Sequence, residues 1–143
     1  MTYDPTATYR STQVASSSPA ARIVLLYQGA IRFGAQHVSA LERGDRETAH
    51  RTSIRCQAIV AGLQETLDLS VGPVAAQLDQ LCDFILRRLV EGNLTKKAGP
   101  TEEALTVLRQ LLGTWQEVAR TPTLASGPVR PVRPSATAIG AVL

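Results

Sequence analysis

The sequence predicts an all-α protein, an antiparallel four-helix bundle, and three observations support this fold class. Hydrophobic residues make up 44% of the chain but aromatic residues only 4%. A core of Leu, Ile, Val and Ala favours helices, because strands favour aromatic and β-branched residues. Four segments carry apolar residues at helical spacing. The connections between these segments are short, so neighbouring helices are expected to run antiparallel.

The 143 residues are predicted to form one domain between two disordered tails. Residues 1–17 are rich in Ser, Thr and Ala and are expected to be a flexible N-terminal segment. Residues 121–143 contain four prolines, which lack an amide hydrogen and disfavour helix before them. This tail is therefore expected to be disordered or polyproline-like. The bundle is assigned to residues 18–120, with helices at about 18–43, 45–67, 74–93 and 101–119.

Local signals define the helix starts. Ser18 can cap the first helix, and Pro19 then occupies the first helical position, where proline is favoured. Asp45 is the predicted cap of the second helix, directly after a glycine that ends the first. Residues 97–100 contain Gly and Pro and are predicted to break the chain before the fourth helix, which Thr101 is expected to cap.

Charge and hydropathy argue against nucleic-acid and membrane partners. Residues 18–119 contain eleven basic and eleven acidic residues, so the net charge of +3 comes from Arg120, Arg130 and Arg133. A nucleic-acid binder concentrates basic residues on a folded face, and only an adaptor role of the Pro-Arg tail stays open. No apolar stretch approaches the roughly 20 residues that span a bilayer. Residues 1–18 also lack the apolar run of a secretory signal, which predicts a cytoplasmic protein without membrane insertion.

No catalytic or metal site is predicted. A di-iron bundle needs two Glu-x-x-His pairs and two further glutamates, whereas this chain has one pair, Glu47 and His50. Cys56 and Cys82 are 26 residues apart and are interpreted as reduced, buried residues rather than nucleophiles. His37 adds no carboxylate partner at helical spacing. The sequence therefore predicts no enzyme activity and no cofactor.

The segment 74–93 is apolar over well over half of its circumference, which is wider than the stripe of an ordinary bundle helix. A narrower apolar line follows the segment 45–67. Three alternatives stay open for what covers these additional apolar residues: a tail of the chain, a second copy of the chain, or a helix of another protein. The candidate binding residues on these two segments are Ile54, Ala58, Ala61, Leu78, Leu81, Cys82, Ile85, Leu86, Arg87 and Val90.

Several segments resemble, in order, the flagellin-specific export chaperones (the FliS family). Residues 18–33 resemble a helix that opens with Ser-Pro and continues with Leu-Tyr-Asp-Gly-Ala. Residues 67–94 are similar to a Leu-Asp turn followed by Leu-Tyr-x-Tyr and Arg-Arg-Leu-x-x-Ala-Asn. The pair Leu111-Leu112 with Trp115 matches the last helix, and Tyr9 with Val14 matches the N-terminal segment. The chain departs from the family pattern at Gln28, Cys82 and Gly92.

The resemblance implies a cytosolic chaperone that binds the C-terminal segment of flagellin. It would prevent premature polymerisation and deliver flagellin to the flagellar export gate. The apolar lines described above would then form a groove for the amphipathic helices of flagellin. The resemblance also implies that the N-terminal segment covers part of this groove and that Tyr9 contributes to gate docking. The alternative from the residues alone is a helical homodimer or adaptor without a flagellin client.

Overall fold

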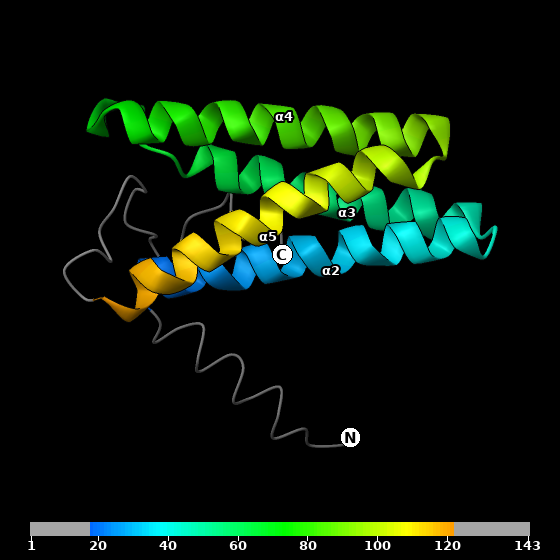
Figure 1. Cartoon of the computed structure of the whole chain (residues 1–143), viewed down its shortest axis with the longest axis horizontal. Coiled ribbons are helices and arrows are strands. Elements are labelled where there is room, and N and C mark those ends of the chain that lie inside the picture. The colour runs from blue at the N-terminus through cyan, green and yellow to red at the C-terminus, as the bar shows by residue number, and fades with distance from the viewer. Residues whose placement is uncertain (1–17, 122–143) are drawn as a thin grey trace, which may run out of the picture.

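The computed structural model describes residues 18–121, which fold into four long helices and one short 3₁₀ helix (Figure 1). The predicted all-α bundle is confirmed. The expectations for residues 1–17 and 122–143, including those for Tyr9, lie outside the described residues. The elements are α2 (Pro19–Glu42), α3 (Arg46–Glu65), η1 (Leu69–Val71), α4 (Pro73–Thr95) and α5 (Ala98–Arg120).

Two of the three predicted N-caps are confirmed. The Oγ of Ser18 accepts a hydrogen bond from the backbone N–H of Ala21 at 3.2 Å, with Pro19 at the start of α2. Oδ1 of Asp45 accepts a hydrogen bond from the N–H of Thr48 at 3.1 Å at the start of α3. Each cap satisfies one of the amide hydrogens that a helix start leaves without an intrahelical partner.

The predicted start of the last helix is wrong. Helix α5 begins at Ala98, directly after a tight turn in which Lys96 adopts the left-handed conformation with φ of 57°. Pro100 therefore lies in the first turn, where its missing N–H removes no intrahelical hydrogen bond. Thr101 is no cap but a fully buried residue within the helix, packed against Gly92 of α4.

The four helices form an antiparallel bundle in which α2 and α4 each pack against both α3 and α5. In Figure 1, α4 runs along the top, α2 lies below it, and α5 crosses in front of α3. The enclosed core is almost entirely aliphatic, with one tyrosine and one tryptophan. Its buried members are Ala20, Ile23, Leu26, Tyr27, Ala30, Cys56, Ile59, Val60, Leu63, Cys82, Ile85, Leu89, Ala104, Leu105, Leu108 and Trp115.

Two polar contacts fix the register of α3 against α4. Near the end of α3, the Gln64 side-chain amide donates to Oδ1 of Asp79 at 3.0 Å and of Asp83 at 2.8 Å. At the opposite end, the amide nitrogen of Asn93 lies 3.0 Å from Nδ1 of His50. The stretch of α3 and α4 between these contacts is therefore held in one alignment.

Candidate functional site

Two rows of exposed or half-buried apolar residues lie on the outside of the bundle, one on α3 and one on α4. Ile54, Ala58 and Ala61 follow one another at helical spacing on α3, and Leu86, Val90 and Leu94 do so on α4. We call these six residues the α3–α4 groove. The exposed fractions of Ile54, Val90 and Leu94 are 44%, 40% and 77%. The antiparallel register places both rows in the same stretch of the bundle, between the two polar contacts except for Leu94, which follows Asn93 directly.

The α4 side of this groove is hollowed. The hollow has a volume of about 390 Å³ and is lined by Leu86, Arg87, Val90, Glu91, Leu94 and Thr95. Leu86 is half-buried and packs against the core, so it forms a fixed floor. Arg87 and Glu91 are exposed and place opposite charges beside it. An open, apolar, rigid hollow of this kind can receive side chains from an amphipathic helix.

A second exposed apolar area lies at the other end of α4. Val74 opens the helix, and Leu69 and Val71 belong to the preceding η1; the exposed fraction of each is 58%. Leu81 is also exposed, and its position seven residues after Val74 places both on one face of α4. Leu78, by contrast, is half-buried and packs against the core. Helix α4 therefore carries exposed apolar residues in both of its halves.

The predicted site residues are not all on the surface. Ile54, Ala58, Leu81, Arg87 and Val90 are exposed, and Ala61, Leu78 and Leu86 are half-buried. Cys82 and Ile85 lie in the core. Their side chains do not reach the surface in this structure, and we leave them out of the groove.

Sequence reasoning missed Leu94, which is the most exposed large apolar residue of the described chain. The signal was present, because Leu94 continues the row of Leu86 and Val90 at intervals of four residues. It also missed Leu69 and Val71. The pattern gave no helical period there, and the segment was assigned to a turn.

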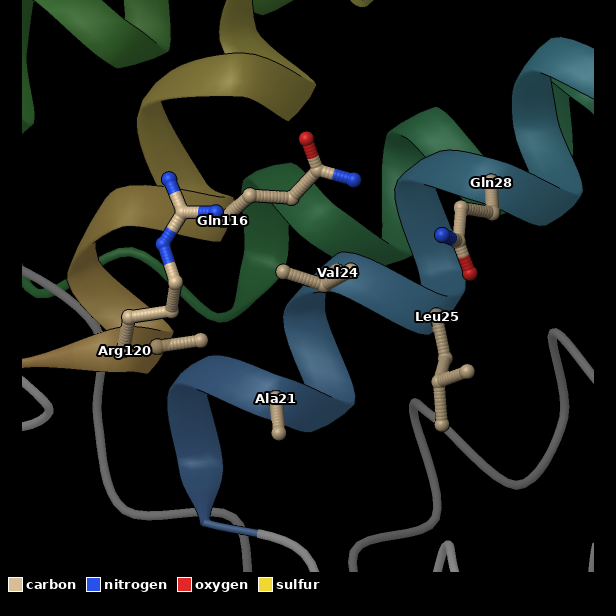
Figure 2. Close-up of a pocket in the computed structure, with 7 residues that line it drawn as sticks. Ala21, Val24, Leu25, Gln28, Gln116 and Arg120 are labelled. Atoms are coloured by element: carbon tan, nitrogen blue, oxygen red, sulfur yellow. The ribbon is translucent and has the colours of Figure 1, made fainter.

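A further hollow, of about 380 Å³, lies where α2 begins and α5 ends (Figure 2). Figure 2 shows the Gln116 side chain extending from α5 above Val24 of α2, and the Arg120 side chain extending toward Gln116. Amides, a guanidinium and small apolar side chains line it together: Ala21, Val24, Leu25, Gln28, Gln116, Ala119 and Arg120. None of these residues belongs to the α3–α4 groove, so the two hollows are separate features.

The described residues offer no catalytic arrangement. Burial raises the pKa of Cys56 and of Cys82 to about 12, with Asp79 and Asp83 adding to the effect at Cys82, so both thiols stay protonated. The ring of His37 is buried and hydrogen-bonded to the carbonyl of Ala49. Within residues 18–121, no three His, Cys, Asp or Glu side chains gather closely enough to hold a metal ion.

No helix within residues 18–121 combines the length and the hydropathy needed to cross a bilayer.

A family model described as "Flagellar protein FliS" matches residues 2–122, most of the chain. The chain belongs to the FliS family. It is similar to the "Flagellar secretion chaperone FliS" of Bacillus subtilis, with 25% identity over 80% of this chain and 85% of that protein. It is 30% identical to "Flagellar secretion chaperone FliSB" of Pseudomonas aeruginosa, over 75% of this chain and 86% of the relative. It is 32% identical to the "Flagellar secretion chaperone FliS" of Campylobacter jejuni, over 82% of this chain and 92% of the relative.

The family resemblance expected from the sequence is thereby confirmed. The three FliS relatives are matched over 85%, 86% and 92% of their own length. The α3–α4 groove lies well inside the matched range.

Proposed function

We propose that this chain is a cytoplasmic export chaperone that binds the C-terminal helical segment of flagellin. Binding prevents premature polymerisation, and the complex delivers flagellin to the flagellar export gate. Membership of the FliS family supports the chaperone role, since relatives carry the name flagellar secretion chaperone. The client and the gate are inferred from the resemblance.

The observation that carries the proposal is the α3–α4 groove. Its two apolar rows on neighbouring antiparallel helices form the kind of surface on which an amphipathic helix can lay its apolar face. Covering the exposed parts of Ile54, Val90 and Leu94 removes apolar surface from water, and a fully buried side chain of this size contributes about 1.5–3 kcal/mol. Folding a client segment opposes this gain by about 2–5 kcal/mol, so the interface must extend beyond the groove.

The second apolar area supplies the extension. Val74 lies twenty residues before Leu94 at the opposite end of α4, and Leu69 and Val71 belong to the preceding η1. At 1.5 Å per residue Val74 and Leu94 are about 30 Å apart along α4, and at 3.6 residues per turn they lie on nearly opposite faces. We therefore place the client across α4, from the α3–α4 groove to the face that carries Val74 and Leu81. Tyr9 is proposed to contribute to gate docking.

The test is calorimetric titration of the full chain with the C-terminal segment of the flagellin from the same genome. We expect one-to-one binding with a negative heat-capacity change, the mark of apolar burial. The variant V90E/L94E should weaken binding at least tenfold, because it places two carboxylates in the groove. The control T106E/Q110E adds the same charge on exposed positions of α5 and should bind as the wild type does.

Two results would count against the proposal. One is the absence of binding by a chain that circular dichroism shows to be folded. The other is a stable dimer that V90E/L94E converts to a monomer, because the groove would then be the contact between two copies. Sedimentation of the free chain distinguishes this homodimer from the chaperone.

A further inference from the structure

Two arginines from different helices converge on one phenylalanine at the edge between α2 and α3. The guanidinium carbon of Arg32 lies 5.4 Å from the ring centre of Phe33, and that of Arg55 lies 5.6 Å from it. Arg51 precedes Arg55 by one turn of α3, and all three arginines are exposed. We call Arg32, Phe33, Arg51 and Arg55 the basic edge.

The basic edge makes no ion pair within residues 18–121, although Arg51 interacts electrostatically with Asp45 and Glu47 precedes it by one turn. The ion pairs of this part of the chain use Arg43, Arg88 and Arg120, and none uses an arginine of the basic edge. Arg51 donates only to the hydroxyl of Thr48, at 3.3 Å. Arg51 and Arg55 are like charges four residues apart on α3. Such a pair destabilises a helix by about 0.2–0.5 kcal/mol. This repulsion is a small cost to the free protein, and Glu47, four residues before Arg51, opposes it.

The aromatic ring orients these cations. A guanidinium above an aromatic face is attracted to the electron-rich ring, which is worth about 0.5–1 kcal/mol at an exposed site. Stacking uses the flat face of the guanidinium and leaves its N–H donors free at the rim. Those donors match the two oxygens of a carboxylate in a bidentate contact.

We propose that the basic edge is a docking surface for an acidic segment of a protein partner. Its carboxylates would pair with Arg32 and Arg55, and Arg51 would extend the site along α3. The short reach of the edge favours a protein segment over nucleic acid, which needs a longer row of phosphate contacts. Glu47, one turn before Arg51, also limits the positive surface.

This surface is separate from the α3–α4 groove and does not depend on the proposed function. On the helical wheel of α3, Arg55 lies on the side of α2, since it reaches Phe33. Ile54 and Ala61 lie toward α4, beside Gln64, which contacts Asp79 and Asp83. A chaperone with its groove occupied would still offer the basic edge to a second protein.

The probe is a fluorescein-labelled peptide of about twelve residues, half of them glutamate, measured by fluorescence anisotropy at about 50 mM salt, where surface charges are weakly screened. We expect R32Q/R55Q to weaken binding at least tenfold. The control R46Q/R109Q removes the same charge from exposed arginines elsewhere and should change the affinity less than twofold. R32K/R55K keeps the charge but lacks the planar fork and should weaken binding severalfold.

Three outcomes overturn the proposal. The full chain does not bind the glutamate peptide at millimolar concentration, while circular dichroism shows it folded. The two glutamine variants lose affinity equally, so that net charge alone explains binding. A single-stranded oligonucleotide of equal charge binds more tightly than the peptide and loses its affinity in R32Q/R55Q, which makes the edge a phosphate-binding surface.

Discussion

Gly92 of α4 packs closely against Thr101 at the start of α5, and replacing it by alanine should destabilise the bundle. A Cβ at this position would overlap Oγ1 of Thr101. It would also lie 3.2 Å from the backbone nitrogen of Thr101 and 3.3 Å from the carbonyl oxygen of Lys97. Thr101 is fully buried and β-branched, so its side chain has little freedom to move away. The two helices must separate to admit the methyl group.

The size of the effect follows from two opposing contributions. Overpacking a well-packed core costs typically about 1–3 kcal/mol. Replacing glycine by alanine inside a helix returns about 0.8–1.0 kcal/mol. Gly113 isolates the second contribution, because a Cβ there meets no atom within 4 Å and the residue is exposed on α5. The difference between G92A and G113A is therefore the overpacking cost itself, about 1–3 kcal/mol.

Thermal unfolding followed by circular dichroism measures both variants. In a domain of this size each kcal/mol shifts the Tm by about 4–8 °C. We expect the Tm of G113A to exceed that of the wild type and the Tm of G92A to be lower. Adding T101A to G92A should recover part of the loss, because it removes the overlapping Oγ1 but leaves the two backbone contacts. A Tm of G92A equal to that of G113A would refute the reasoning.

Three further predictions concern single side chains of the bundle. Burial lowers the pKa of His37 below its ordinary value of about 6.5, and nearby Lys96 adds to the effect. As the pH drops below about 6.5, the unfolded chain therefore binds a proton before the folded chain does, and the free energy of unfolding falls. Chemical denaturation at pH 7.5 and about 5.5 should show a smaller loss in H37Q; an unchanged loss would contradict the assignment. Cys56 and Cys82 should react with a thiol reagent only after unfolding, and fast labelling of the native chain would show that one of them is accessible. S18A should lower the free energy of unfolding by about 1 kcal/mol through loss of the α2 cap, and an unaltered denaturation midpoint would show that the cap is dispensable.

The caps of α2 and α3 were predictable because Ser18 and Asp45 act on amides only three residues away. The start of α5 was not. Gly99 and Pro100 were interpreted as a break, although proline in the first turn costs no hydrogen bond. What decides the matter is the packing of Thr101 against Gly92, a contact between different helices that no local signal contains.

For the surface of α4, too, one part of the structure was predictable from the sequence and another part was not. The sequence established that the apolar arc is too wide for one core contact, and Val90 and Leu81 are indeed exposed. It could not establish which part of the arc faces inward, because helical spacing alone gives no reference direction. The packing of α4 against α3 and α5 supplies that direction and places Cys82 and Ile85 in the core.

The two apolar areas of α4 lead to one more prediction about the client. Val74 is about 30 Å from Leu94 along α4, too far for both to contact one client side chain. Sites this far apart contribute additively to a binding free energy when each is covered independently. We therefore expect the calorimetric losses of L69E/V74E and V90E/L94E to add within about 0.5 kcal/mol in the quadruple variant. If L69E/V74E binds flagellin as the wild type does while remaining folded, the client occupies the α3–α4 groove alone. The apolar surface at η1 would then require a different cover.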